Sequence, residues 1–280
     1  MLLRIATRRS RLARTQTEWV ATRLRQAHPG LETVLVETAT AGDRDRATPL
    51  ADIGGTGLFT KALEDAVADG RADVAVHSFK DLPTAQPSGL AIAAVPARED
   101  HRDVLVTAGG GGLDSLAAGA VVATSSPRRA QQLVRARGDL VTAPIRGNVE
   151  TRLAKIHAGE FDATILAAAG LARLGLSAEV CEVLDFLPAP GQGALAVECR
   201  SDDEATRALV ASIDHADTRD TVAAERAWLA ATGAGCATSA AALCILDGDE
   251  VELRWYLDGR EGSGRGPRSE AVTVGREAAS

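Results

Sequence analysis

The chain has 280 residues, of which 45% are hydrophobic and 25% charged, so it is neither disordered nor fibrous and is long enough for two or three domains. Aromatic residues make up only 3%, which disfavours a nucleic-acid surface built on base stacking, and a formal charge of −7 disfavours a general polyanion binder. Only three of the 31 basic residues are lysines, and clustered arginines would form a local anion site in this acidic body.

The N-terminal segment argues against export. MLLRIATRRSRLART carries five arginines and no apolar core of signal-peptide length, and no apolar run of about 18 residues occurs anywhere. We therefore expect a cytoplasmic protein without a membrane span. The cysteines match no zinc-ligand spacing, so we expect individual thiols and no metal site. They are Cys181, Cys199, Cys236 and Cys244.

The first third of the chain alternates apolar runs with amphipathic stretches, as βαβ units do. Strands are expected at LLRIAT, ETVLVETA and ADVAVHSF, with helices at TQTEWVATRLRQA and KALEDAVADG. Further along, two apolar strands flank a charged turn, and we place a domain crossing near residues 96–103. The segment DIGGTGLFTKALE lacks both the GxGxxG and the GK[ST] pattern, so it predicts a glycine-rich turn rather than a nucleotide loop.

A second α/β unit is expected from strands VVAT, LVTAPI and ATILAAA, with helices from Pro127 through Val134 and around Arg152–His157. The Pro/Gly-rich segment FLPAPGQG is the expected return crossing, which would make a hinged body of two lobes. A small third α/β domain would follow, with a helix over Thr221–Thr232 and strands AALCIL and VELRWYL. After Leu257 we expect a mobile glycine-rich part and at most one strand, near Glu270–Val274.

Three strand-to-helix junctions, IATRRS, ATSSPRR and PIRGNVETR, end an apolar strand in Thr, Ser or Arg. At the second, Ser126 is suited to cap the helix and Pro127 to occupy its first position. Helix N-terminal amides and arginines at the carboxyl ends of strands form anion sites, whereas the alternative is that each arginine pairs with a surface acid. The residues expected to converge on a ligand with several carboxylates or phosphates are Arg8, Arg128, Arg129, Arg146 and Arg152.

The segment ADVAVHSFKDLP predicts a buried strand that ends in His77, Ser78, Lys80 and Asp81. In a partly desolvated cleft among cations, Asp81 would stay ionised, stabilise a carbocation and transfer a proton. The alternative is an ordinary turn with a solvated Lys80. Cys236 lies in GAGC, where small neighbours leave room for a bulky adduct, whereas the other three cysteines fit apolar patterns and are expected to be buried.

Taken together, the motifs resemble the porphobilinogen deaminase (hydroxymethylbilane synthase) family over nearly the whole chain. In the family's order they are RIATRRSRLA, GGTGLFTKALE, ADVAVHSFKDLPT, REDHRDVLV, TSSPRRAQQL, IRGNVETRL, ILAAAGLARLG, LPAPGQGALAVECR, AAERAWLAA and GAGC. The resemblance implies an α/β fold of three domains. Residues 1–98 with 192–213, and residues 99–191, would resemble the two lobes of type II periplasmic binding proteins. Residues 214–280 would form a small α/β domain that carries the cofactor cysteine.

The resemblance also implies an enzyme of tetrapyrrole (haem, sirohaem and corrinoid) biosynthesis that deaminates porphobilinogen, couples four molecules head to tail and releases hydroxymethylbilane. Its cofactor would be dipyrromethane, joined by a thioether to Cys236, and its catalytic aspartate Asp81. The implied cofactor contacts are Ser78, Lys80, Thr124, Ser126, Arg128, Arg129, Arg146 and Gly147. The implied substrate contacts are Arg8, Ser10, Phe59, Arg152 and Arg173. We expect a monomer with no nucleic-acid or membrane partner.

The chain departs from the family pattern in three places. Many members have lysines before the GLF segment, where this chain has Asp52 and Thr56, and after the cysteine they often continue with a Pro-containing strand, where this chain reads ATSAA. The C-terminus is shorter, and the helix that commonly completes the third domain is not evident. Two alternatives therefore stay open: a repurposed paralogue, and a non-catalytic two-lobed protein that binds a carboxylate or an oxyanion.

Overall fold

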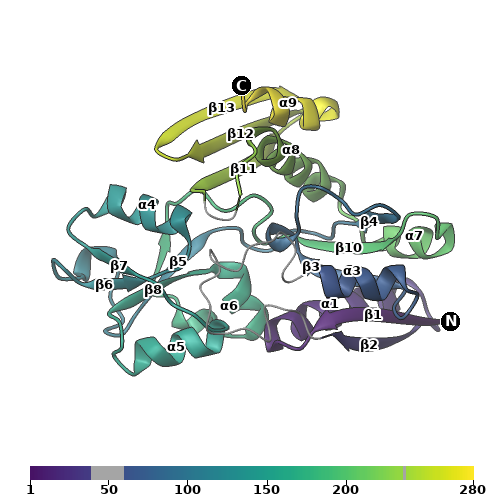
Figure 1. Ribbon diagram of the computed structural model, residues 1–280, viewed down its shortest axis with the longest axis horizontal. Coiled ribbons are helices and arrows are strands. Elements are labelled where there is room, and N and C mark those ends of the chain that lie inside the picture. Colours follow the sequence, from purple (N-terminus) through teal and green to yellow (C-terminus); the bar gives the residue numbers. More distant parts are fainter. Residues whose placement is uncertain (39–59, 236–237) are drawn as a thin grey trace. The chain divides into compact units, whose positions relative to one another are not determined.

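The computed structural model describes residues 1–38, 60–235 and 238–280 (Figure 1). The chain divides into two compact units. Unit 1 comprises Met1–Glu99 and Ala194–Ala223, and unit 2 comprises Asp100–Gly193 and Ala224–Ser280. The chain therefore passes from one unit to the other three times. A finer division into three domains remains a prediction.

Unit 1 is built on one mixed five-stranded sheet. Its elements are β1 (Leu2–Arg8), α1 (Arg11–Ala27), β2 (Glu32–Thr38), α3 (Lys61–Ala68), β3 (Val74–Ser78), β4 (Leu90–Ala94), β10 (Leu195–Arg200), α7 (Glu204–Val210) and the start of α8 (Ala216–Thr232). The strand order is β2-β1-β3-β10-β4, in which β1 runs parallel to β2 and β3, and β10 runs antiparallel to β3 and β4. The carboxyl ends of β1 and β3 therefore meet at one edge of the sheet.

The two faces of this sheet are covered by different helices because successive side chains of a strand point to opposite faces. Val20 and Leu24 of α1 pack with Ile5 of β1. Leu63 of α3 packs with Ala6, the next residue along the same strand. The apolar runs that predicted these strands and helices thus supply both halves of the core.

Unit 2 contains a second mixed five-stranded sheet. Its elements up to the return crossing are β5 (Asp103–Thr107), β6 (Val121–Ala123), α4 (Pro127–Ala136), β7 (Val141–Ala143), α5 (Val149–His157), β8 (Ala163–Ala167), α6 (Ala168–Leu174) and β9 (Glu182–Leu184). The strand order is β7-β6-β8-β5-β9, with β6 parallel to β7 and β8, and β5 antiparallel to β8 and β9. Leu133 of α4 packs on one face, and Leu153 of α5 and Leu171 of α6 pack on the other.

The two sheets follow the same plan. Each has a βαβαβ run whose first strand lies between the other two, and each receives an antiparallel strand from another part of the chain, β10 in unit 1 and β5 in unit 2. The expectation of a mixed α/β protein with two sheet-and-helix lobes is confirmed. The resemblance of these lobes to type II periplasmic binding proteins remains an expectation.

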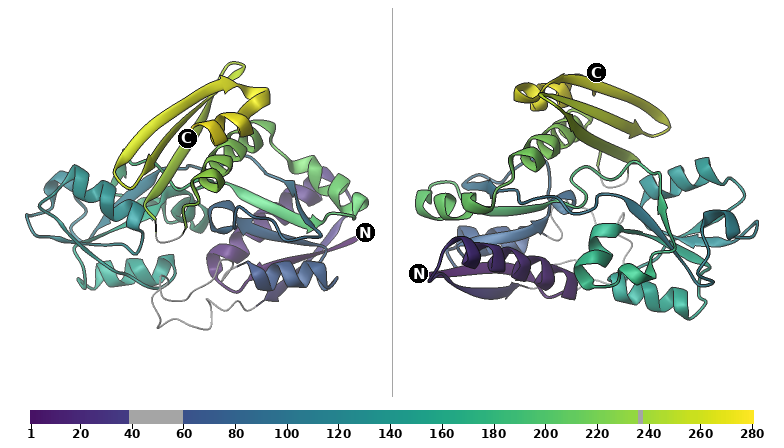
Figure 2. Two further views of the ribbon diagram at one scale, coloured as in Figure 1. Left: turned by 45° about the horizontal axis from the view of Figure 1, so that its top comes forward. Right: turned by 180° about the vertical axis from the view of Figure 1, so that it is seen from behind.

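A three-stranded antiparallel sheet completes unit 2 (Figure 2). It consists of β11 (Ala240–Asp247), β12 (Glu250–Leu257) and β13 (Arg260–Pro267), and α9 (Ala271–Glu277) follows it. Trp228 of α8 and Val274 of α9 pack with Leu253 of β12 in one core. Helix α8 begins at Ala216, five residues before the predicted start.

The expectations for the C-terminal segment were wrong in two respects. The glycine-rich part after Leu257 is strand β13, and residues 271–277 form helix α9 where a strand was predicted. Glycines 262, 264 and 266 share one face of β13, where an added Cβ would lie 2.5 Å from Trp255, 2.9 Å from Ala278 and 2.8 Å from Val274, respectively. Glycine is therefore needed there because α9 and Trp255 approach the strand closely. Helix α9 was not evident in the sequence.

Candidate functional site

The candidate residues of unit 1 lie at the carboxyl ends of the neighbouring strands β1 and β3. Arg8 ends β1, and Ser10 caps α1, since its Oγ accepts a hydrogen bond from the Ala13 amide at 3.2 Å. Ser78 ends β3, and a 3-10 turn then carries Lys80 and Asp81. The sheet thus brings these candidates to one edge.

The turn after β3 presents Asp81 to solvent because the residue before Lys80 is anchored. The Phe79 side chain is buried, and its amide donates to the Ala194 carbonyl at 3.0 Å, whereas Lys80 and Asp81 are exposed. Ser78 hydrogen-bonds the side-chain amide of Gln16 on α1 at 3.0 Å. The strand end, the turn and α1 are therefore held as one piece, which fixes the position of Asp81.

The candidate residues of unit 2 lie at the carboxyl ends of β6, β7 and β8. Ser126 and Pro127 begin α4 as predicted, with Ser126 Oγ accepting from the Arg129 amide. Buried Thr124 accepts a hydrogen bond from the Ser126 amide at 3.2 Å. Arg173 of α6 donates to the Gly193 carbonyl at 2.8 Å. The three parallel strands therefore direct their following residues to one edge of this sheet.

Arg128 and Arg129 are buried and paired with an acid that the sequence analysis did not select. Asp103 begins β5, and its carboxylate accepts from Arg128 at 2.6 Å and from Arg129 at 2.7 Å. It also accepts from the side-chain amide of Gln192 at 2.9 Å. Burial alone would raise the pKa of Asp103, but the two guanidiniums outweigh it and hold that pKa well below its usual range. The cluster carries a net charge of +1.

The sequence left open that each arginine pairs with a surface acid of the chain. Arg128 and Arg129 do pair with an acid, but that acid, Asp103, is buried. The signal was an aspartate at the head of the apolar run DVLV in REDHRDVLV. A charged residue that enters a buried strand needs a partner, because an isolated buried charge is too costly. That signal does not say which arginines provide it.

We expect Asp103→Asn to lower the free energy of unfolding by about 3–5 kcal/mol, because it leaves two buried guanidiniums without a counter-charge. Urea unfolding at neutral pH measures the loss. The matched control is Asp247→Asn, which removes one exposed partner of Arg265 and should have a much smaller effect. Equal losses in both variants would contradict the prediction.

The difference between the wild type and Asp103→Asn also has a predicted pH dependence. The depressed pKa of Asp103 means that its stabilising contribution is complete above the unfolded value of about 3.9 and is lost as the pH falls below it. The two stabilities should therefore converge as the pH is lowered below about 4. A constant difference down to pH 3 would show that the charge is not responsible.

A second group of guanidiniums lies beside this cluster. Arg152 of α5 donates from Nε to the Gly147 carbonyl at 3.0 Å, and Asn148 between them caps α5. Burial, and then the charges of Arg129 and Arg146, lower the pKa of Arg152 to about 10. Arg129 of α4 and Arg146 of the loop after β7 are thus close enough to repel Arg152 of α5. A bound polyanion would relieve that repulsion.

Gly147 makes the sharp bend that places its carbonyl beside Arg152. Its φ is +114°, and an added Cβ would lie 2.6 Å from the Thr151 side chain. A side chain at this position would be strained and would also disturb the first turn of α5. Gly147 therefore contributes through its backbone.

Four residues considered in the sequence analysis lie outside the described residues: Cys236, Phe59, Asp52 and Thr56. Of the other cysteines, Cys199 and Cys244 are buried as expected, whereas Cys181 is only half-buried. Burial raises the pKa of the Cys199 thiol to about 11. The described part of the chain contains no group of three potential metal ligands and no helix long and apolar enough to cross a membrane.

A comparison with known protein families identifies the family of this chain. A family model described as "Porphobilinogen deaminase, dipyromethane cofactor binding domain" matches residues 3–208. The chain belongs to the porphobilinogen deaminase family. Membership places it in tetrapyrrole biosynthesis, with porphobilinogen as the substrate that the family implies and dipyrromethane as the cofactor of the matched domain.

Two solved structures that this chain resembles are distant from it in sequence. The methionine-binding protein MetQ is 10% identical with a TM-score of 0.48, and the match covers 80% of this chain and 94% of that chain. The periplasmic VFT2 domain of Bordetella pertussis BvgS is 14% identical with a TM-score of 0.44, over 76% of this chain and 86% of that chain.

Proposed function

We propose that the chain is a hydroxymethylbilane synthase that couples four porphobilinogen molecules head to tail and releases the linear tetrapyrrole by hydrolysis. At each coupling the C–N bond of an aminomethyl arm breaks and ammonia leaves. A C–C bond forms to the free α-carbon of another pyrrole, which loses a proton. The observation within the structure that supports this proposal is the gathering of guanidiniums in unit 2, where one buried aspartate holds Arg128 and Arg129. Arg129 and Arg146 also lie close enough to repel Arg152.

The residues of unit 2 fit a dipyrromethane cofactor. Each pyrrole brings two carboxylates, and a guanidinium binds a carboxylate through two parallel hydrogen bonds. Arg146 and the Arg128–Arg129–Asp103 cluster supply positive charge, while Thr124 and Ser126 add hydroxyls at the same sheet edge. The proposed contacts from unit 1 are Ser78 and Lys80. When bound through a thioether to Cys236, the cofactor supplies the attachment point for chain growth.

Asp103 gives Arg128 and Arg129 a fixed geometry. Arginine side chains have several rotatable bonds, and ordering them at the moment of binding costs conformational entropy. Because both guanidiniums are already held by Asp103, this cost is met during folding rather than during binding. The buried acid thus favours a rigid cationic edge, at a net charge that still attracts carboxylates.

Asp81 is the proposed catalytic residue. Loss of ammonia from porphobilinogen leaves positive charge on the aminomethyl carbon and the pyrrole, and a carboxylate placed nearby stabilises that charge as it develops. The anchored turn presents Asp81 and Lys80 side by side at the end of β3. Lys80 is then proposed to hold a carboxylate while Asp81 meets the cationic ring. The proposed substrate contacts are Arg8, Ser10, Phe59, Arg152 and Arg173.

The intact mass of the purified protein tests the proposed function. Protein from a host that produces porphobilinogen should exceed its sequence mass by one dipyrromethane, because the thioether survives denaturation. Cys236→Ser should show only the bare chain mass. Cys181→Ser removes a half-buried thiol from the same unit and should keep the adduct. Wild-type protein at its bare mass would contradict the proposal.

A further inference from the structure

The hairpin turn between β12 and β13 has an unusual backbone at one residue. The turn consists of Asp258 and Gly259, whose φ angles are +47° and +90°. Two positive values in a two-residue loop are typical of a type I′ turn, which Asp-Gly favours. Among the described residues, Asp258 is the only one other than glycine with a positive φ.

Asp258 binds the backbone of Ser239 with two hydrogen bonds. Asp258 Oδ1 accepts from the Ser239 amide at 3.1 Å, and the Asp258 amide donates to the Ser239 carbonyl at 3.1 Å. Ser239 is buried and immediately precedes β11, whose first residue pairs with Leu257. The side chain thus extends the β11–β12 ladder by one residue beyond the end of the strands.

Gly235 and Thr238 are joined by two hydrogen bonds. The Thr238 amide donates to the Gly235 carbonyl at 3.0 Å, and the Gly235 amide donates to Thr238 Oγ1 at 3.2 Å. Residues 235 and 238 are therefore joined on either side of the segment that contains Cys236. Since Ser239 is bound to Asp258, this junction has a fixed attachment on one side.

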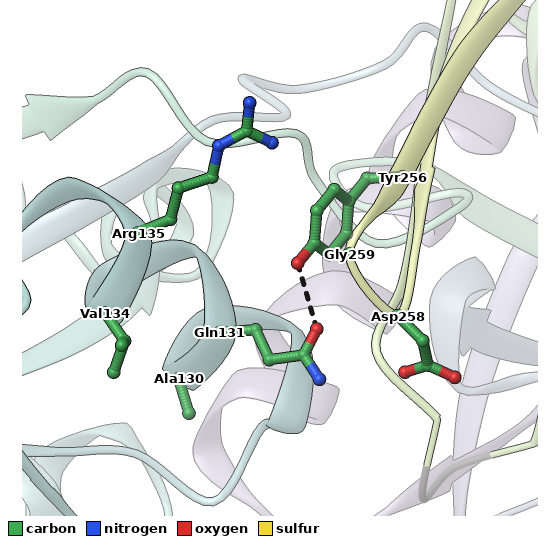
Figure 3. Close-up of a pocket in the computed structure, with 7 residues that line it drawn as sticks. All are labelled: Ala130, Gln131, Val134, Arg135, Tyr256, Asp258 and Gly259. Atoms are coloured by element: carbon green, nitrogen blue, oxygen red, sulfur yellow. Dashed lines mark hydrogen bonds between the residues drawn. The ribbon is translucent and has the colours of Figure 1, made fainter.

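The hairpin itself is attached to α4. The Tyr256 hydroxyl donates to Gln131 Oε1 at 2.9 Å, and Figure 3 shows the two side chains pointing at each other beside Asp258 and Gly259. Arg135 of the same helix pairs with Glu261 of β13 at 2.9 Å. Helix α4 begins with the proposed cofactor-binding residues Arg128 and Arg129. Contacts therefore join Gln131 and Arg135 of α4 to the hairpin, and the hairpin turn to Ser239.

We propose that Asp258 is a positioning residue for cofactor attachment: by holding the Ser239 amide, it keeps Ser239, three residues after Cys236 in the sequence, in register with the hairpin. The inference rests on the proposed function, in which Cys236 is the attachment site. The contact needs an amide hydrogen at position 239, which every residue except proline provides. The sequence ATSAA, which lacks the proline-containing strand frequent in the family, permits this contact.

Two substitutions distinguish the effect of the Asp258 carboxylate from the effect of the turn conformation. Asp258→Gly keeps the positive φ without strain but removes the acceptor, whereas Asp258→Asn keeps an acceptor oxygen and tolerates the left-handed conformation. Asp249→Gly is the matched control, because it makes the same change in the β11–β12 turn at the opposite end of the sheet. Ser239→Ala keeps the amide and removes only the hydroxyl.

The experiment follows loading of apoprotein, made in a host unable to synthesise porphobilinogen, after addition of porphobilinogen. Intact mass gives the rate of the dipyrromethane gain, and thermal unfolding of each apoprotein gives its stability. We expect Asp258→Gly to load about tenfold more slowly, the effect of losing one hydrogen bond to the backbone. Asp258→Asn, Asp249→Gly and Ser239→Ala should load close to the wild-type rate.

The outcomes distinguish this inference from the proposed function. The proposed function fails, and the inference with it, if the wild-type apoprotein gains no dipyrromethane or if the Cys236→Ser apoprotein does gain it. If the wild type loads and Asp258→Gly loads equally fast, only the positioning role of Asp258 is overturned. The role is also overturned if loading falls in Asp249→Gly or Ser239→Ala as it does in Asp258→Gly, because the effect would then follow stability or the hydroxyl.

Discussion

Replacing Asp81 by asparagine is expected to reduce turnover of porphobilinogen by about 10²-fold or more, because a preorganised charge that stabilises a developing cation typically has an effect of that size. Asparagine keeps the shape and the hydrogen-bonding groups of the side chain. The side chain is exposed and lies in a turn anchored by Phe79, so the fold should be unaffected. Ammonia release during a single turnover measures the step directly.

The comparison for Asp81→Asn is Asp69→Asn. Asp69 is also an exposed carboxylate of unit 1, and it pairs with Arg71 at the surface. That variant should turn over porphobilinogen at the wild-type rate. Comparable rates in Asp81→Asn and the wild type would assign the catalytic charge to another residue.

Loss of individual arginines is expected to stop the reaction at different stages. Arg146→Leu removes one of the two arginines that repel Arg152 in unit 2 and should prevent stable binding of the cofactor, so that the bare chain mass predominates. Arg8→Leu removes a cation from unit 1 and should leave the cofactor in place but block addition of substrate. Native mass spectrometry after exposure to porphobilinogen resolves species with zero to four added units.

Arg146 is the better choice for this test than Arg128 or Arg129, because those two residues also neutralise Asp103 and their loss would disturb folding. Arg102→Leu and Arg71→Leu are controls for the two units, since both arginines are exposed and pair with a nearby aspartate. Both controls should show the wild-type series of masses. The same series in Arg146→Leu and Arg8→Leu would show that these arginines bind no carboxylates of the reaction.

Local sequence was sufficient where one short segment determines one element. Ser126 and Pro127 satisfy the start of α4 within the helix's own first turn, so the beginning of this helix could be predicted without its neighbours. The apolar runs that form the strands of both sheets could likewise be recognised from their local hydrophobic pattern. The family resemblance then added the identity of the ligand, which no local pattern contains.

The C-terminal region was misread because its signal depends on what packs against it. Glycine at every second position of β13 replaces the usual apolar alternation, and it does so only because Trp255 and α9 occupy that space. In α9 and its C-cap, the residues Ala271, Val274 and Ala278 have helical spacing, although β-branched residues favour a strand. Asp103 was missed for a similar reason, since its partners lie 25 and 26 residues away.

The position of β10 has a consequence for synthesis of the chain on the ribosome. This strand lies between β3 and β4 in the unit 1 sheet, yet it is translated after residues 100–193 of unit 2. The nascent β3 and β4 therefore lack their shared neighbour until all residues of the second five-stranded sheet have been translated. The part of the protein that is made first is thus completed late, and its exposed strand edges are the ones that a chaperone would need to shield.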